Sequence, residues 1–176
     1  MDQFKQNLDG IRRRVPDARE GLPEDLFLLI SELTPMINVD LLIKNKQHQT
    51  LLTWRDDIFY GSGWHIPGGI IRFKEKIETR IQKVALTELG TQVTFNPVPI
   101  AITELMAENR NVRGHFISLL YTCELVMPLD PTNLANNRPQ LGQWAWHNGC
   151  PDNLIAAHEK FRPFISNIKS VEQFDE

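Results

Sequence analysis

A glycine pair and two glutamates are the residues of this sequence whose spacing suggests chemistry. Gly68 and Gly69 precede Glu75, and Glu88 follows thirteen residues after Glu75. Adjacent glycines let the backbone turn sharply and bring its carbonyl oxygens close to a ligand. Hard divalent cations such as Mg²⁺ prefer oxygen ligands from carboxylates, carbonyls and water. A glycine carbonyl and a helical glutamate around one point would therefore hold such a cation and leave room for phosphate oxygens.

The other acidic residues near this stretch fit different roles. Glu75 and Glu88 lie about three and a half helical turns apart, roughly on one side of a helix. Lys83 shares that side, so we expect Glu75 to pair with it and to support the site without binding metal. Asp40 lies inside an apolar segment, where a carboxylate is rarely buried without a partner. It either contacts a ligand or makes a structural hydrogen bond.

The segment that carries Glu88 has the pattern of a helix over residues 78–89. Its apolar residues recur at helical spacing and form one stripe, made of Ile77, Ile81, Val84, Ala85 and Leu89. Gly90 follows as a residue that commonly ends a helix. Residues 55–69, which come before it, are rich in glycine and predict an irregular loop. The chemistry would therefore sit on a loop and the helix after it.

Most of the remaining chain has the composition of strands. We expect a strand over residues 37–43, a returning strand over 50–54, an antiparallel pair over 98–105 and 115–126, and a short strand over 143–147. A short helix opens at Pro23 and ends at Thr34, and a closing helix covers 153–168 with an interruption near Pro163. A central helix flanked by many antiparallel strands predicts an α+β sandwich.

The length of 176 residues is that of one domain with one core. Residues 1–20 form an expected N-terminal extension, in which Phe4, Leu8 and Ile11 have helical spacing. The arginine run at 12–14 is interpreted as a solvated helix end, and contact with a phosphate or with an acidic patch of a partner is the alternative. Residues 21–168 form the domain, and residues 169–176 are a C-terminal tail.

The overall charge excludes some classes of ligand. Acidic residues number 22 against 19 basic ones, for a net charge of −3, so no general attraction to nucleic acid or to an anionic membrane is expected. An anionic substrate would need a local site. Cys123 and Cys150 have no metal-binding spacing, and with no apolar leader or long apolar run they favour a reducing, cytoplasmic location without membrane contact.

From Gly69 onward the sequence resembles the Nudix hydrolase family. The family pattern is Gly, five residues, Glu, seven residues, then Arg-Glu-apolar-x-Glu-Glu-x-Gly. Gly69, Glu75, Glu88 and Gly90 match this pattern, and Lys83 keeps the charge of the family arginine. Val84 and Thr87 stand where two of the three clustered glutamates would be. This departure argues against an ordinary Nudix pyrophosphatase, which binds several metals to attack phosphorus.

The GDP-mannose mannosyl hydrolases are the branch of the family that the sequence resembles most. Their box reads Leu-Thr-Met-Ala-Glu-Leu-Gly, which is similar to residues 84–90 here, and the resemblance covers roughly residues 22–168. It implies a Nudix-type α/β/α sandwich, with a mixed, mainly antiparallel sheet between helices. It also implies a single Mg²⁺, or Mn²⁺ in its place. The implied ligands are a carbonyl of Gly68 or Gly69, Glu88 and Gln140.

The same resemblance assigns further roles. Arg55 matches an arginine on the diphosphate, Asp40 matches an aspartate that contacts the sugar, and Arg72 lies close to where another arginine is expected. That branch has a histidine base directly after its glutamine, where this chain has Leu141. The residues that could replace this catalytic base are His115, Glu104, Glu108 and His147.

The leading functional expectation is an enzyme that hydrolyses a nucleoside diphosphate sugar with Mg²⁺. GDP-mannose and GDP-glucose are the first candidates. Water would attack the anomeric carbon, and the leaving nucleoside diphosphate would be stabilised by metal and arginine. A pyrophosphatase that attacks phosphorus of another nucleoside diphosphate derivative, and a domain that binds a nucleotide sugar without turnover, are the alternatives. The resemblance also implies a homodimer through the N-terminal region.

Overall fold

The structure, a computed structural model, describes residues 2–166. Its α-helices are α1 (Gln3–Arg14), α2 (Glu24–Leu33), α3 (Ile77–Leu89) and α4 (Arg162–Ile165), and its 3-10 helices are η1 (Ala18–Glu20), η2 (Pro131–Asn133) and η3 (Ala156–Phe161). Its strands are β1 (Met36–Ile43), β2 (Thr50–Asp57), β3 (Gly61–His65), β4 (Gly68–Ile70), β5 (Val93–Phe95), β6 (Ala101–Met106), β7 (His115–Leu125) and β8 (Trp144–His147). The predicted tail and the last two residues of the predicted closing helix lie outside the described residues.

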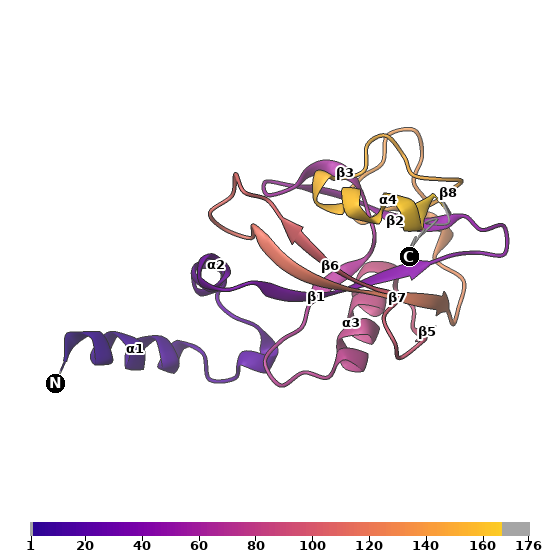
Figure 1. Cartoon of the computed structure of the whole chain (residues 1–176). Coiled ribbons are helices and arrows are strands. Elements are labelled where there is room, and N and C mark those ends of the chain that lie inside the picture. The colour runs from indigo at the N-terminus through magenta and orange to yellow at the C-terminus, as the bar shows by residue number, and fades with distance from the viewer. Residues whose placement is uncertain (1, 167–176) are drawn as a thin grey trace, which may run out of the picture.

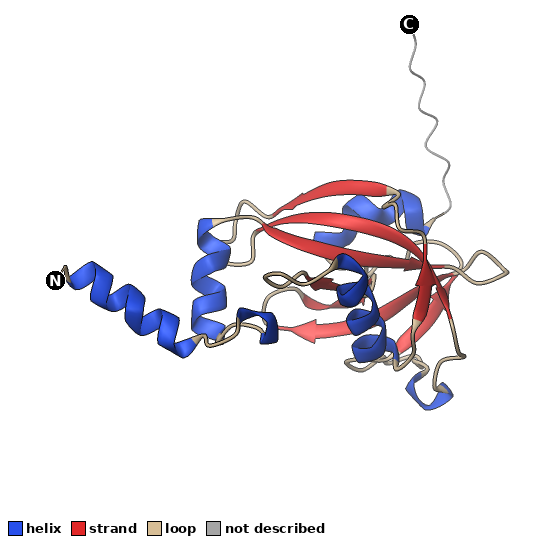
Figure 2. Cartoon of the chain, turned by 90° about the horizontal axis from the view of Figure 1, so that it is seen from below, coloured by secondary structure: helices blue, strands red, loops and turns tan. Residues whose placement is uncertain are grey.

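The strands form two sheets. One sheet has the order β4-β1-β7-β5, and β6 also pairs with β7. The β1–β7 pair is parallel, and the other pairs in this sheet are antiparallel. The second sheet, β3-β2-β8, is antiparallel throughout. The expected mixed, mainly antiparallel α+β arrangement is confirmed (Figures 1 and 2).

Helical segments cover the sheets on opposite sides, as a sandwich requires. In Figure 1, α3 lies on one side of β1 and β7, and β2, β3 and α4 lie on the other. Leu41 and Ile43 of β1 pack in the cluster that includes α3. Leu42 packs in the opposite cluster with Phe161 and Ile165. A strand covered on both faces carries apolar residues almost continuously, which explains why residues 39–43 are all buried.

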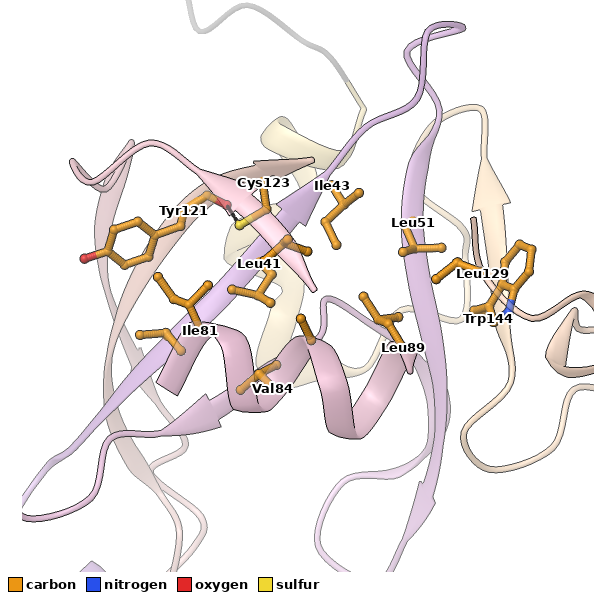
Figure 3. Packing of buried hydrophobic residues seen from close by; sticks show 13 residues of the cluster. Leu41, Ile43, Leu51, Ile81, Val84, Leu89, Tyr121, Cys123, Leu129 and Trp144 are labelled. Atoms are coloured by element: carbon orange, nitrogen blue, oxygen red, sulfur yellow. Dashed lines mark hydrogen bonds between the residues drawn. The ribbon is translucent and has the colours of Figure 1, made fainter. Parts of the chain in front are cut away.

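The helix that carries Glu88 was predicted closely. Figure 3 shows Ile81 and Leu89 directed from α3 toward the strands, and these two residues and Val84 are buried in one cluster with Leu41 and Ile43 of β1. Ile77 is the member of the predicted stripe that stays exposed, because it begins the helix. Gly90 ends the helix with φ of 69°, and its N–H donates to the Leu86 carbonyl. Such a left-handed residue is common at this position and favours glycine.

The strand expected to return along residues 50–54 pairs differently from the expectation. β2 begins with one bridge, between Thr50 and Lys44, the residue directly after β1, and then runs into the second sheet. The expected strand over residues 50–54 is confirmed as the start of β2, but its pairing with the preceding strand ends at this bridge. The reason is that β1 already has β4 on one edge and β7 on the other.

Residues 55–69 are also more regular than predicted. β2 extends to Asp57, β3 covers Gly61–His65, and β4 begins at Gly68. The glycines serve close packing here: a side chain on Gly63 would come within 2.7 Å of the Asn153 carbonyl oxygen. Glycine in a strand often marks such a close backbone approach.

The helical segments near the two ends of the described chain are less regular or less buried than an ordinary packed helix. Residues 153–166 form η3 followed by α4 instead of one helix, and Pro163 lies in the first turn of α4, where proline is tolerated. At the other end, α1 buries no residue and extends away from the body in both views (Figures 1 and 2). In α2 the buried residue is Ser31, whereas Leu29 and Leu33 are exposed.

Candidate functional site

Two cavities meet at Arg55 and His65, which line both. The first, called here the arginine cavity, has a volume of about 680 Å³; its wall includes Asp40, Gly68, Glu108, Arg110, Arg113 and His158. The second, called here the glutamate cavity, has a volume of about 860 Å³; its wall includes Thr53, Trp54, Glu88, Leu141 and Trp144. The predicted metal ligands Gly68 and Glu88 therefore lie on either side of the Arg55–His65 junction.

Gly68 lies between two carboxylates. Its N–H donates to Glu88 Oε1 at 3.2 Å. A β-carbon added to Gly68 would collide with Asp40 Oδ1 and lie 3.0 Å from the Val39 carbonyl oxygen. Any larger residue would push Asp40 away, so only glycine lets both carboxylates approach the same backbone position.

The strand ladder identifies which glycine carbonyl is available. Leu41 N–H donates to the Pro67 carbonyl, and Ile71 N–H donates to the Ile37 carbonyl. In an antiparallel ladder, hydrogen-bonded pairs alternate with non-bonded ones. Gly69 and Val39 thus form a hydrogen-bonded pair, and Gly68 and Asp40 form a non-bonded pair. The Gly68 carbonyl therefore faces away from β1 at the edge of the sheet, as does its N–H, which reaches Glu88.

Glu88 is held by second-sheet residues as well as by Gly68. The Thr53 hydroxyl donates to Glu88 Oε2 at 3.1 Å, and His65 Nε2 lies 3.3 Å from the same oxygen. The Nδ1–H of His65 donates to the Thr53 carbonyl at 2.8 Å, which fixes the orientation of the imidazole ring. Partners of this kind orient a carboxylate before it binds a metal.

Asp40 is fully buried and has one satisfied oxygen. Its Oδ2 accepts hydrogen bonds from the Ser118 hydroxyl of β7 and from the Asn38 amide at 2.9 Å. Its Oδ1 is buried and has no hydrogen-bond partner among the described residues. Burial raises the pKa of Asp40 to about 6, although the bonds from Ser118 and Asn38 act in the opposite direction. An unsatisfied buried oxygen beside a cavity is a position for a ligand or a cation.

These donors fit a divalent cation. Within residues 2–166 there is no group of three or more His, Cys, Asp and Glu side chains that could hold a metal by themselves. The oxygens available here come instead from the Gly68 backbone carbonyl and from the Glu88 carboxylate, which accepts the Gly68 N–H. Carbonyl and carboxylate oxygens together are the donor set of Mg²⁺ and Mn²⁺.

Glu75 forms the ion pair that was expected. Its carboxylate lies 3.1 Å from Lys83 Nζ and 2.6 Å from Arg80 Nη2, and it accepts the Arg72 backbone N–H at 3.0 Å. Burial raises its pKa, but these hydrogen bonds outweigh burial and the pKa is lowered overall. The predicted pairing with Lys83 is confirmed, and Arg80 adds a second cation. The network fastens the start of α3 to the loop after β4.

Several residues named from the sequence lie away from both cavity walls. Gln140 is exposed in the loop before β8, next to Leu141, which lines the glutamate cavity. The guanidinium of Arg72 donates to the Arg19 carbonyl at 3.2 Å. His115 Nε2 pairs with Glu104 at 3.1 Å on the β6–β7 hairpin. The roles assigned to Gln140, Arg72 and His115 stay predictions.

Of the four residues considered as replacements for the missing base, one lines a cavity. Glu108 belongs to the wall of the arginine cavity. His147 packs edge-on against Trp64, with ring centroids 4.6 Å apart, and burial lowers its pKa. Glu104 and His115 pair with each other.

Among the residues on the wall of the arginine cavity that sequence reasoning missed are Arg110, Arg113 and His158. The Nδ1 atom of His158 accepts the Ile66 backbone N–H at 3.1 Å, and burial holds its pKa well below the usual value. The ring is therefore neutral and protonated on Nε2. The signal for the arginines was their spacing of three within the polar tip of the hairpin. No local pattern distinguished His158 from a core residue.

Comparison with solved structures shows that this fold is shared with Nudix hydrolases. A MutT protein from Methanosarcina mazei Go1 has a TM-score of 0.57 at 17% identity, covering 76% of this chain and 95% of its own. An ADP-ribose pyrophosphatase from Streptococcus suis has a TM-score of 0.55 at 16% identity, covering 81% and 97%. A Nudix hydrolase from Nitrosomonas europaea has a TM-score of 0.52 at 16% identity, covering 65% and 72%.

Sequence comparisons add less. No family model matches the chain. The low-salt glycan biosynthesis protein Agl8 of Haloferax volcanii is 29% identical over 84 residues, which are 48% of this chain and 53% of that protein. The matched part thus spans about half the length of this curated relative. Across the described residues, no helix has the length and apolar character needed to cross a bilayer.

Proposed function

We propose that this chain, which has the Nudix fold, is a hydrolase that uses a divalent metal, Mg²⁺ first and Mn²⁺ second, on a nucleoside diphosphate derivative. The observation that carries the proposal is the convergence at Gly68, whose N–H binds Glu88 and whose α-carbon adjoins the free oxygen of Asp40. A nucleoside diphosphate sugar of the GDP-mannose or GDP-glucose kind is the first substrate to test. The glycan-biosynthesis name of the partial relative also favours a substrate that contains a sugar.

The metal would be held by the Gly68 carbonyl and by Glu88, with Gln140 as the further ligand that the family resemblance supplies. When bound, it would neutralise charge on the diphosphate. The direction of the Gly68 carbonyl supports Gly68 over Gly69 for this role. Thr53 and His65 would hold the Glu88 carboxylate in its orientation.

The other residues would act on the substrate directly. Arg55 lies at the junction of the two cavities and would donate to the leaving diphosphate from there. Asp40 would contact a sugar hydroxyl through Oδ1. Glu108 is the candidate base for the attacking water, because His115, which the sequence also suggested, lies outside the cavity walls. A homodimer and a cytoplasmic location stay predictions.

A binding protein without turnover is the second candidate. The observation that favours it is that both oxygens of Glu88 already have protein partners, from Gly68 and from Thr53 and His65. A carboxylate satisfied in this way has to exchange a partner before it binds metal. The two candidates differ in turnover, since either could bind the nucleotide sugar.

The experiment is product release from a panel of nucleoside diphosphate sugars with Mg²⁺ in ¹⁸O-water. Wild type would be compared with Glu88→Gln and with Glu78→Gln, an exposed residue of the same helix as the matched control. We expect Glu88→Gln to lose about 10²-fold or more in rate and Glu78→Gln to be unaffected. Label in the free sugar supports attack at the anomeric carbon, and label in a phosphate-containing product means attack at phosphorus. Binding without turnover by wild type would overturn the enzyme proposal.

A further inference from the structure

Three guanidinium groups converge on the ring of Tyr60. The distances from each Cζ atom to the ring centroid are 5.0 Å for Arg55, 4.6 Å for Arg110 and 5.4 Å for Arg113. Tyr60 lies in the turn between β2 and β3, and the two further arginines lie in the loop between β6 and β7. All four residues line the arginine cavity. Gathering three positive charges costs Coulomb energy, which contact with an aromatic face offsets only in part.

Two of these arginines have unused hydrogen-bonding capacity. Arg55 lies 3.2 Å from Asp57 and is partly neutralised by it. Among residues 2–166, Arg110 and Arg113 form no ion pair, and both Arg110 Nη1 and Arg113 Nε are buried without a hydrogen-bond partner. A buried guanidinium N–H without an acceptor is unfavourable, so these groups are suited to a ligand that supplies oxygen atoms.

The position of Arg113 is built by three elements of the fold. Its backbone N–H donates to the buried Ser31 hydroxyl of α2 at 3.0 Å. Its guanidinium lies 5.4 Å from the ring centroid of Phe27 and 4.8 Å from that of Phe59. Its φ of 51° is in the left-handed region, which disfavours residues with a side chain. Backbone strain of this kind persists where the surroundings hold a side chain in place for binding.

The charge of the cavity wall selects an anion. The wall carries Arg55, Arg110, Arg113 and Lys160 against Asp40 and Glu108. Guanidinium groups match phosphate oxygens because their planar N–H donors can bind two oxygens at once. Three guanidinium groups around one ring offer more N–H donors than a single carboxylate can accept. They suit a diphosphate, which has several oxygen atoms.

We infer that Arg110 and Arg113 complete, with Arg55, a diphosphate-binding cluster assembled on Tyr60. This inference rests on the proposed function for the identity of the anion, and it assigns two residues that the family pattern does not supply. The cluster holds the diphosphate of the substrate and keeps hold of it after cleavage. The nucleoside diphosphate product is therefore a competitive inhibitor whose affinity depends on these arginines.

The test uses inorganic pyrophosphate as the probe, titrated calorimetrically into the full chain in EDTA, so that neither metal nor turnover is needed. We expect Arg110→Gln and Arg113→Gln each to weaken binding at least tenfold, and Tyr60→Leu to weaken it more than Tyr60→Phe. Arg13→Gln removes an exposed guanidinium of α1, outside both cavities, and is the matched control, expected within twofold of wild type. Inorganic phosphate is expected to bind wild type more weakly than pyrophosphate.

These binding results test the arginine cluster independently of whether the protein hydrolyses any substrate. Absence of pyrophosphate binding by wild type, or equal binding by folded Arg110→Gln, overturns the cluster. Arg110→Gln is decisive even where Arg113→Gln fails to fold, because Arg110 has no link to Ser31 and no left-handed backbone. If pyrophosphate binding follows the expected pattern while no nucleotide sugar is hydrolysed, the cluster stands and the proposed enzyme function fails.

Discussion

The hydroxyl of Ser31 accepts a hydrogen bond from the backbone N–H of Arg113 at 3.0 Å, which ties helix α2 to the loop of the β6–β7 hairpin. The same hydroxyl donates to the Leu28 carbonyl at 2.6 Å. We predict that Ser31→Ala lowers the free energy of unfolding by about 1 kcal/mol, because the partly buried Arg113 N–H loses its acceptor. Pyrophosphate affinity should fall with it, since Arg113 loses its support. Urea denaturation and calorimetric titration measure the two effects, with the exposed Ser62→Ala as control; unchanged affinity would mean that Ser31 acts on the fold alone.

The Thr53–Glu88 hydrogen bond should matter for metal affinity. Replacing Thr53 by Val keeps its shape and removes the hydroxyl that orients Glu88. Loss of a partner of this kind typically weakens metal binding about 10- to 100-fold, and we expect that range for Mg²⁺ in an equilibrium titration. Thr87→Val, at an exposed position of the same cavity, is the control. Equal Mg²⁺ affinity in Thr53→Val and wild type would remove Glu88 from the metal site.

Gly68 and Asp40 should be energetically coupled. We predict that Gly68→Ala destabilises the fold by about 2 kcal/mol, as overpacking does, because the new methyl collides with Asp40 Oδ1. Combined with Asp40→Ala, the loss should be smaller than the sum of the two single losses by about 1 kcal/mol. Gly10→Ala, where only Arg13 comes near, serves as the control. Strictly additive losses in urea denaturation would contradict the contact.

Restoring the two missing glutamates of the family box, at positions 84 and 87, should affect stability differently. Val84 is buried and lies against Gly69, so Val84→Glu places a carboxylate in the core and should cost about 3 kcal/mol or more. Thr87 is exposed on the wall of the glutamate cavity, so Thr87→Glu should change stability by less than about 0.5 kcal/mol. Its new carboxylate should raise Mg²⁺ affinity. Thermal unfolding and Mg²⁺ titration of both variants check this, and a stable Val84→Glu would show that the site has room for the family pattern.

His158 should make stability depend on pH. Burial lowers its pKa in the folded chain, whereas the unfolded chain binds the proton with a pKa near 6.5. The unfolded state thus binds more protons in acid, so this contribution is complete above about pH 6.5 and falls below it by up to about 1.4 kcal/mol per pH unit. His158→Asn, whose amide oxygen can still accept from Ile66, should flatten that slope between pH 6.5 and 5. The exposed His48→Asn should keep it, and equal slopes in urea denaturation would contradict a neutral His158.

Local patterns predicted the parts of the fold that depend on neighbouring residues. The α3 helix, its Gly90 end, the β6–β7 hairpin and the Glu75–Lys83 pair all involve residues close in sequence. The pairing of β2 was missed because it depends on which strand edges are already occupied. That question is decided by β7, more than fifty residues later in the chain.

The candidate site was predicted in the same uneven way. Glu88, Asp40 and Arg55 stood out through spacing, burial and resemblance. Arg110 and Arg113 did not, because their significance comes from Tyr60, which lies fifty residues before Arg110. His158 was expected within a regular helix. Its distinguishing feature, the hydrogen bond that its Nδ1 accepts from the Ile66 backbone N–H, joins residues far apart in the sequence and is visible only in the structure.

The parallel pairing of β1 with β7 determines when, during folding, the chain becomes able to bind a ligand. Asp40 and Ser118, which meet across that pair, are 78 residues apart. Contacts between distant segments form slowly, whereas a helix such as α3 forms from neighbours. On a ribosome, Asp40 cannot meet Ser118 until residues 115–125 have been made. During refolding, helix signal should therefore recover before any ligand binding does, and the interval between them is the time that β7 takes to reach β1.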